Sequence, residues 1–372
     1  MAIDAHQIFT YNNVDELHKM PKHSDWLFGH ISYSSTSTVT VNSNPIGFEQ
    51  IQFFVPKIIL FLNATEITIH SYNVTPQSIV TAINNTNIPN TTQPKVAVQP
   101  KVTKAQYIEH INALKQHILR GDCYEINYCQ EFYSANAAIN PIDIFSKLNA
   151  ITPNPYAALY KQQHSYVLCQ SPERYISKVE NILTSQPIKG TIKRNTGDAQ
   201  NDELLKQQLQ QSPKEQSENV MIVDLVRNDL SRVCMPHTVK VSELFGVHTY
   251  PQVHHLISTV QGSLLPNAAF ADIIQATFPM GSMTGAPKVK VMELISKYEA
   301  TNRGLFSGTI GYIMPNGNFD FNVVIRSILY NAATQYISYY VGSGITIYCN
   351  AEQEYEECLL KAKAMQQVLL GN

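Results

Sequence analysis

The chain has 372 residues, of which 44% are hydrophobic and 15% charged, so it can bury a large core as one big domain or two closely joined ones. The formal net charge is −2 and there is no basic block, so bulk electrostatics do not support nucleic-acid binding. The six cysteines are scattered without a C-x-x-C pair, which fits reduced thiols in a cytosolic protein better than a disulfide framework.

The sequence shows neither a secretion signal nor a membrane span. The first residues lack a basic segment followed by an apolar one, so they do not resemble a signal peptide. The most apolar early run, Ile51–Leu62, is interrupted by Pro56 and Lys57 and is too short to cross a bilayer. We therefore expect a soluble, cytoplasmic protein without membrane contact.

The first 100 residues predict strands and turns, because short apolar runs alternate with clusters of Asn, Thr and Pro. The segment 84–100 is rich in those polar residues and is expected to form an exposed loop or linker. From Thr103 the apolar residues recur at helical spacing, with Thr103 as the N-cap and Gly121 as the stop.

The rest of the chain mixes both kinds of element. Strand-like segments lie between residues 123 and 172 and between 305 and 347, a polar helix is expected around Asp202–Gln211, and a closing helix from about Ala351 to Leu370. Because regular βαβ alternation is absent, the predicted class is α+β with large, mainly antiparallel sheets.

Two acidic pairs are spaced for one face of a helix. Glu215 and Glu218 are three residues apart, as are Glu354 and Glu357. For either pair alone a solvated face is the simpler interpretation. Both pairs run directly into apolar stretches, however, and an inward-facing carboxylate needs a partner because unpaired buried charge is costly. Oxygen ligands with room for water suit Mg²⁺ better than zinc.

Other segments carry further candidate groups. Residues 186–191 read QPIKGT, and its lysine, Lys189, would in isolation be a solvated turn residue. The acid of SPER, Glu173, precedes it, and Arg326 is flanked by apolar residues and could clamp a carboxylate or pair with a core acid. An acid, an amine and cation-binding carboxylates in one chain indicate an enzyme.

Glycine-flanked segments add possible anion sites. In GSMTGAPK, Thr284 or Gly285 followed by Pro287 predicts a helix start with free amides, which could bind an anion or simply cap a core helix. In VGSGI, Gly342 and Gly344 indicate either close approach to a ligand or a bulge.

Two further groups have a structural interpretation. Asp224, Arg227 and Asp229 are interpreted as a structural salt-bridge network. For His254 and His255, a core histidine is the default.

Taken together, these segments resemble the family that includes component I of anthranilate synthase and of aminodeoxychorismate synthase, with isochorismate and salicylate synthases. The resemblance runs from Gly121–Phe132 to Glu354–Met365, about two thirds of the chain. It implies one intertwined α+β unit with two large antiparallel sheets packed face to face and helices outside. Residues 1–100 would form a strand-rich part of that fold, and residues 101–372 the catalytic region, which binds chorismate with Mg²⁺ between the sheets.

Within the family the loop lysine distinguishes the reactions, because PIKGT resembles aminodeoxychorismate synthases whereas anthranilate synthase-like members have PIAGT. The resemblance implies that Lys189 attacks C2 of chorismate as the C4 hydroxyl leaves, and that ammonia then attacks C4 and displaces the lysine. Glu173 matches the general acid, which needs a raised pKa to stay protonated. A free lysine has a pKa of about 10.4, so Lys189 must be made neutral by burial or a nearby cation.

The resemblance assigns the remaining site residues. Glu218 and Glu357 match direct magnesium ligands, and Glu215 and Glu354 match ligands acting through water. The other matches concern the substrate: Arg326 and the amides of Gly342 and Gly344 would hold its carboxylates, His255 would lie near its ring, and Thr284 near the amination site.

Several positions depart from the family or have a less defined role. Lys288 and Lys361 sit at family lysine positions and are assigned only charge support. Glu125 stands where the amine-transferring members usually have glutamine and isochorismate synthases a lysine, which argues against water as the nucleophile. Phe306 replaces an aromatic hydroxyl. The N-terminal region lacks an evident tryptophan-feedback motif, so we expect no inhibition by tryptophan.

The resulting hypothesis is formation of 4-amino-4-deoxychorismate from chorismate and ammonia, on the route to 4-aminobenzoate and folate. None of the six cysteines lies in a glycine-rich nucleophile elbow, so ammonia should come from a separate glutamine amidotransferase subunit, component II. The alternatives are anthranilate synthase component I, separated by Lys189, and isochorismate synthase, disfavoured at Glu125. A non-catalytic chorismate-binding subunit is a further alternative, which magnesium-dependent turnover would exclude.

Overall fold

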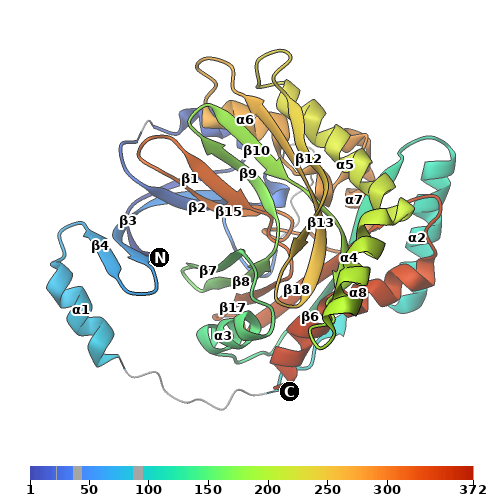
Figure 1. Cartoon of the computed structure of the whole chain (residues 1–372). Coiled ribbons are helices and arrows are strands. Elements are labelled where there is room, and N and C mark those ends of the chain that lie inside the picture. Colours follow the sequence, from blue (N-terminus) through green and yellow to red (C-terminus); the bar gives the residue numbers. More distant parts are fainter. Residues whose placement is uncertain (22, 37–43, 87–94, 372) are drawn as a thin grey trace.

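Two antiparallel sheets form the body of the protein, for which we use a computed structural model that describes residues 1–21, 23–36, 44–86 and 95–371 (Figure 1). Within those residues, the larger sheet has eleven strands in the order β1-β3-β2-β15-β16-β9-β10-β13-β11, with β4 added to β3 and β12 to β13. The smaller sheet has seven, in the order β14-β6-β18-β17-β8-β7, with β5 beside β6. The predicted α+β class with large antiparallel sheets is therefore confirmed.

The strands of the larger sheet are β1 (Ala2–Tyr11), β2 (Leu27–Ile31), β3 (Ile51–Leu62), β4 (Ile67–Ser71), β9 (Arg174–Val179), β10 (Ile182–Gln186), β11 (Ile188–Lys193), β12 (Lys240–Thr249), β13 (Val253–Ser263), β15 (Thr309–Ile313) and β16 (Phe319–Asn322). Those of the smaller sheet are β5 (Gln99–Pro100), β6 (Glu125–Ser134), β7 (Tyr156–Gln162), β8 (Ser165–Ser171), β14 (Gly285–Ala286), β17 (Ser327–Asn331) and β18 (Tyr336–Ile345). The α-helices are α1 (Pro76–Asn85), α2 (Lys104–Leu119), α3 (Pro141–Ile151), α4 (Ala199–Gln211), α5 (Pro213–Ser231), α6 (Phe270–Thr277), α7 (Lys288–Tyr298) and α8 (Ala351–Leu370). Three short 3₁₀ helices cover Val14–Lys19, Tyr33–Ser35 and Gly281–Met283.

The smaller sheet is buried on both faces, because alternate residues of a strand point to opposite sides. Val167 and Leu329 pack in the core shared with the larger sheet, whereas their neighbours Leu168 and Ile328 pack in a second core. That second core also contains apolar residues of α2, α3, α7 and α8. The sheets therefore lie face to face, with these four helices on the outer side of the smaller sheet.

Several predicted helices are confirmed. Thr103 caps α2 in a capping box with Gln106, and α8 has the predicted limits. The polar helix α4 begins earlier than expected, at Ala199, because Asp198 caps it by accepting from two backbone amides. Among the described residues, α5 and α8 are the longest helices, and each carries one acidic pair near its start.

Other expectations were wrong or incomplete. Helix α1 was missed, since its residues continue the Asn- and Thr-rich composition, and it packs against β4 at the edge of the molecule (Figure 1). Of the predicted linker 84–100, residues 87–94 lie outside the described residues. Pro287, rather than Thr284 or Gly285, is the N-cap of α7, and Thr284 ends the short helix before it.

The chain crosses between the two sheets at two places that matter for the site. Residues 172–173 connect β8 of the smaller sheet to β9 of the larger one, and residues 323–326 connect β16 back to β17. The crossings are tied together, because the Val323 amide donates to the carbonyl of Glu173 and the Gln170 amide to that of Arg326. Glu173 and Arg326 are therefore held at the junction of the sheets.

All six cysteines are buried free thiols, as predicted. No helix in the described part of the chain is long and apolar enough to cross a membrane.

Candidate active site

Lys189 lies in a β-bulge of β11, the strand at one edge of the larger sheet. The register of β11 against β13 shifts so that Lys189 and Gly190 together oppose Leu256. Gly190 has φ +92°, a conformation that favours glycine, and a Cβ there would lie 2.9 Å from Glu215 Oε2. The glycine of the motif thus permits both the bulge and the close approach of α5.

The Lys189 amine reaches across to the smaller sheet. Its Nζ donates a hydrogen bond of 2.5 Å to Oε1 of Glu125, the first residue of β6, and lies 4.0 Å from Oε2 of Glu218 on α5. The side chain of Lys189 is 11% exposed and that of Glu125 only 1%. Lys189 is therefore not a solvated turn residue, and its ion pair joins the two sheets.

Gly344 on β18 leaves the space for this ion pair. A Cβ at that position would lie 2.6 Å from Glu125 Oε1 and 3.1 Å from Lys189 Nζ. The close approach proposed for this glycine occurs, but it is to the side chains of the ion pair. Gly342 lies against Cys129 and Tyr128 of β6, and its carbonyl accepts a hydrogen bond from Lys361.

The charges around Lys189 differ from the expectation of a neutral amine. Burial alone would lower the pKa of Lys189, but the carboxylates of Glu125, Glu218 and Glu173 outweigh it and raise the pKa above its usual value. The carboxylates around the amine therefore favour its protonated, ammonium form. The nucleophilic role expected of Lys189 requires this amine to lose its proton, and its acidic neighbours oppose that loss.

Glu173 is placed to hold a proton near neutral pH. It is 4% exposed, and burial raises its pKa to about 7, although Ser282, Lys189, the backbone of Ile188 and Arg326 limit the rise. Its backbone is fixed, because the Ser171 hydroxyl accepts from the Glu173 amide. A carboxyl group with this pKa is suited to general acid chemistry.

Arg326 and His255 line the same region. Arg326 has φ +51° and lies within electrostatic range of both Glu173 and His255. His255 is fully buried on β13, its Nδ1 lies 2.7 Å from the Thr191 hydroxyl, and the backbone of Gly190 also interacts with the ring. Burial, assisted by Arg326, lowers the pKa of His255 to about 3, so the ring is neutral at neutral pH.

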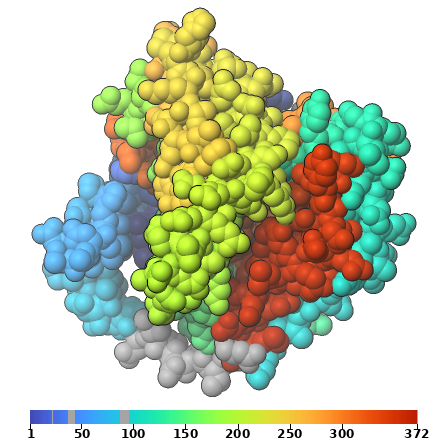
Figure 2. All heavy atoms as spheres, turned by 45° about the vertical axis from the view of Figure 1, so that its right-hand side comes forward, coloured from blue at the N-terminus to red at the C-terminus, as the bar shows by residue number. Residues whose placement is uncertain are grey.

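The two acidic pairs lie on neighbouring helices. In Figure 2 the yellow-green residues of α4 and α5 lie directly against the red α8. Burial would lower the pKa of Lys214, but the charges of Glu218, Glu354, Glu357 and Glu215 raise it, so all four carboxylates act electrostatically on this one ammonium. The two predicted pairs therefore lie on neighbouring helices (Figure 2), within electrostatic range of the same lysine.

The individual carboxylates differ in their balance of burial and charge. Burial raises the pKa of Glu218 to about 7, and the nearby Glu125 and Glu215 add to this rise. Burial also raises the pKa of Glu354. For Glu357 the effect of burial is outweighed by Lys361, 2.6 Å away, and the pKa is lowered.

The donor set suits a hard cation in chemistry, since all four groups offer carboxylate oxygens. In the described ranges, however, no three His, Cys, Asp or Glu side chains converge closely enough to hold a metal ion. Lysine amines balance the negative charge instead. A magnesium ion would therefore need ligands from both helices to draw together, with water or substrate completing its shell.

Five other residues named from the sequence have partners outside the candidate site. Thr284 is fully buried and its hydroxyl donates to the carbonyls at the start of its own 3₁₀ turn. Lys288 forms a 2.6 Å ion pair with Asp229. The salt-bridge network proposed for Asp224, Arg227 and Asp229 is therefore wrong for Asp229, whose ion-pair partner is Lys288. Asp224 and Arg227 pair on the surface.

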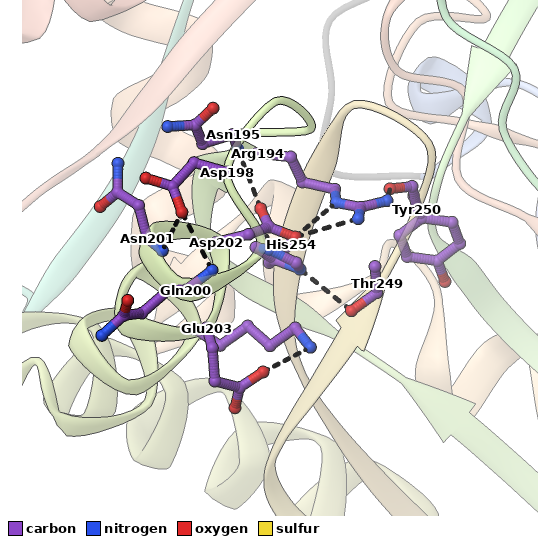
Figure 3. Close-up of polar contacts among 11 residues, drawn as sticks. Arg194, Asn195, Asp198, Gln200, Asn201, Asp202, Glu203, Thr249, Tyr250 and His254 are labelled. Atoms are coloured by element: carbon purple, nitrogen blue, oxygen red, sulfur yellow. Dashed lines mark hydrogen bonds and ion pairs between the residues drawn. The ribbon is translucent and has the colours of Figure 1, made fainter.

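Sequence reasoning missed a network that fixes the strand carrying Lys189 (Figure 3). Asp202 accepts two hydrogen bonds from Arg194, at 3.1 and 2.9 Å, and one from the amide of Asn195. Its other contact is His254 Nε2 at 3.0 Å, and His254 Nδ1 lies 3.0 Å from the Thr249 hydroxyl. Arg194 directly follows β11 and His254 lies on β13, so the network ties the end of the lysine strand to the sheet and to α4.

The signals for the missed residues are weak in sequence. Asp202, Arg194 and His254 are separated by up to 60 positions, and nothing in their spacing brings them together. Glu125 stood out only as a departure from a family pattern, and Lys214 was not singled out at all.

Comparison with known proteins agrees with the fold and the motifs. A family model described as chorismate binding enzyme matches residues 4–367. The chain is 37% identical over 267 residues to aminodeoxychorismate synthase component 1 of Bacillus subtilis, covering 72% of this chain and 56% of that protein. It is 38% identical over 270 residues to the probable chloroplastic aminodeoxychorismate synthase of Oryza sativa, covering 72% of this chain and 30% of that protein.

Among solved structures, anthranilate synthase component I from Streptococcus pneumoniae superimposes with a TM-score of 0.83 at 24% identity, covering 98% of this chain and 91% of that one. This similarity establishes the fold. The family match covers nearly the whole sequence, so the chain belongs to the chorismate-binding enzyme family. It spans about half the length of the bacterial relatives it matches, and less of the plant ones.

Proposed function

We propose that the protein is an aminodeoxychorismate synthase component I, which converts chorismate and ammonia to 4-amino-4-deoxychorismate. The observation that carries this proposal is the position of Lys189, a buried amine between the two sheets and within the field of Glu173. The names of the relatives support it, since several similar proteins are called aminodeoxychorismate synthase component 1.

The proposed reaction has two displacements. The Lys189 amine forms a bond to C2 of the ring while the double bonds shift and the C4–oxygen bond breaks. Ammonia then bonds to C4, the double bonds shift back, and the bond between C2 and the lysine breaks. Water is released, and the enolpyruvyl group stays attached, so pyruvate is not a product.

Glu173 supplies the proton that the departing C4 hydroxyl needs in order to leave as water. With its pKa near 7, a substantial fraction of Glu173 is protonated at neutral pH. Arg326 would bind a substrate carboxylate, and the neutral ring of His255 would lie near the substrate ring.

For nucleophilic attack, Lys189 must lose a proton, which its carboxylate neighbours oppose in the structure as described. We propose that Mg²⁺ is held by Glu218 and Glu357, with Glu215 and Glu354 acting through water. When bound, the ion would anchor a substrate carboxylate and offset the negative charge of its ligands. Lys214, which lies among the same four carboxylates, would then be repelled or displaced.

Ammonia is proposed to come from a glutamine amidotransferase subunit, because the sequence carries no glutaminase nucleophile motif. The word "component" in the names of the bacterial relatives supports a two-part enzyme.

Mass analysis of the products formed from chorismate, ammonium and Mg²⁺ tests the proposal. We expect aminodeoxychorismate without pyruvate. Formation of anthranilate and pyruvate would identify an anthranilate synthase instead, and formation of isochorismate with no incorporated nitrogen would identify an isochorismate synthase. Absence of any magnesium-dependent turnover would favour a non-catalytic chorismate-binding subunit.

A further inference from the structure

Glu125 makes the shortest polar contact to the candidate nucleophile. Its Oε1 lies 2.5 Å from Lys189 Nζ, whereas the nearest oxygen of Glu218 is 4.0 Å away. The other oxygen of Glu125, Oε2, is buried and has no hydrogen-bond partner in the described part of the chain. Among the described residues, the hydrogen bond to Lys189 is thus the one that the Glu125 carboxylate makes.

The backbone of Glu125 is firmly held. It begins β6, and its register partner is Ala286 in the two-residue strand β14. On either side, the Tyr124 amide donates to Ala286 and the Asn127 amide donates to Thr284. Lys189, by contrast, lies in a bulge at the sheet edge and has four rotatable side-chain bonds. In this pair Glu125 is the fixed member and Lys189 the adjustable one.

Other acids compete for the same amine. Glu218 and Glu173 both attract Lys189, the first from α5 and the second from the crossing between β8 and β9. If the contact with Glu125 were absent, the amine would move toward those groups. The direction in which the amine points therefore depends on the short contact across the sheets.

We propose that Glu125 is a positioning residue, which holds the Lys189 amine at the junction of the two sheets so that it faces the bound substrate. This inference rests on the proposed function, since it concerns the same site and the same reaction. Glu125 acts through Lys189 and need not touch the substrate itself.

The competing explanation is that the ion pair only stabilises the fold by joining the sheets. Both explanations predict that loss of the contact affects stability, so melting temperature alone does not separate them. A positioning role predicts in addition that Glu125 loses its influence on turnover once Lys189 is absent. A double-mutant cycle measures this coupling.

The experiment compares four proteins: the wild type, Glu125→Gln, Lys189→Met and the double variant. Glutamine keeps the size of Glu125 and one acceptor oxygen, and methionine keeps the length of the lysine stem without an amine. For each protein, kcat and KM for chorismate are measured with ammonium and Mg²⁺, and rates are expressed per folded protein. Glu125→Asp serves as a second, conservative variant, because it retains the charge and retracts the carboxylate by one methylene.

Removing the charge of Glu125 also eases the loss of a proton from Lys189, but we expect the loss of positioning to dominate. Glu125→Gln should then lower kcat by about tenfold to a hundredfold, the range for loss of a hydrogen bond between charged groups, with little change in KM. Glu125→Asp should recover part of that loss. In the Lys189→Met background the effect of Glu125→Gln should shrink to less than about twofold, whereas equal losses in both backgrounds would overturn the proposal. An unchanged kcat in Glu125→Gln would overturn it too.

The same proteins separate failure of this inference from failure of the proposed function. Product identity is read from the wild type, and the coupling is read from the rate of chorismate consumption by the four proteins. If the wild type forms a different product, the proposed function fails whatever the coupling. If aminodeoxychorismate forms and the two substitutions act independently, only the role of Glu125 fails.

Discussion

Replacing Gly344 by alanine should disrupt the site without removing any functional group. The new Cβ would lie 2.6 Å from Glu125 Oε1 and 3.1 Å from Lys189 Nζ, and contacts under 3.0 Å require a shift. To reach ordinary contact at 3.4 Å the carboxylate must retreat by roughly 0.8 Å, and misplacements of that size cost on the order of 10²-fold in rate. Overpacking of a buried site adds a loss of about 1–3 kcal/mol in the free energy of unfolding.

The assay is steady-state amination of chorismate, together with denaturant unfolding of the same preparations. Gly197→Ala is the matched control, because Gly197 is exposed and a Cβ there would meet only Asn195 Oδ1, at an ordinary 3.7 Å. The double variant Gly344→Ala with Glu125→Asp should regain activity relative to Gly344→Ala, since the shorter carboxylate vacates the space. The reasoning is refuted if Gly344→Ala matches the control in both rate and stability.

Four further outcomes are expected. At a constant concentration of free ammonia, kcat/KM for chorismate should fall above pH 7, because Glu173 with a pKa of about 7 gives up its proton there, and the residual rate of Glu173→Gln should lack this pH dependence. Asp202→Asn should lower both the melting temperature and kcat, because it weakens the contacts to Arg194 and His254. The control Asp224→Asn affects only an exposed ion pair and should change the free energy of unfolding by less than about 0.5 kcal/mol. Removal of Mg²⁺ by a chelator should abolish turnover, and Glu357→Gln should raise the Mg²⁺ concentration needed for half-maximal rate; turnover that is insensitive to chelation would contradict the proposed metal site. Millimolar tryptophan should leave the rate unchanged, and a fall in rate on adding it would show that an inhibitory site exists.

Much of the fold could be predicted because its signals are local. The cap at Thr103, the run of strand-like segments and the closing helix depend on residues near one another in sequence, and each is found in the structure. Helix α1 was missed because its composition favours turns, and its packing against β4 distinguishes it from the surrounding loop.

The sequence predicted which residues belong to the site, but not how they are arranged in space. Lys189, Glu173 and the two acidic pairs belong to short motifs and are brought together by the sheets and by α5 and α8. The partner of Lys189 could not be predicted, because Glu125 is 64 positions away and meets it only where β6 passes the bulge in β11. For the same reason the sequence did not reveal the acids that raise the pKa of Lys189, since three separate parts of the chain contribute them.

The central claim is that the amine at position 189 bonds to the ring during turnover. Mass spectrometry of protein quenched during reaction with chorismate and Mg²⁺, with ammonium omitted, tests it most directly. We expect a peptide containing Lys189 that has gained the mass of chorismate less one water, and this species should disappear when ammonium is added before quenching. Full amination activity in Lys189→Ala, with no such adduct in the wild type, would contradict the claim.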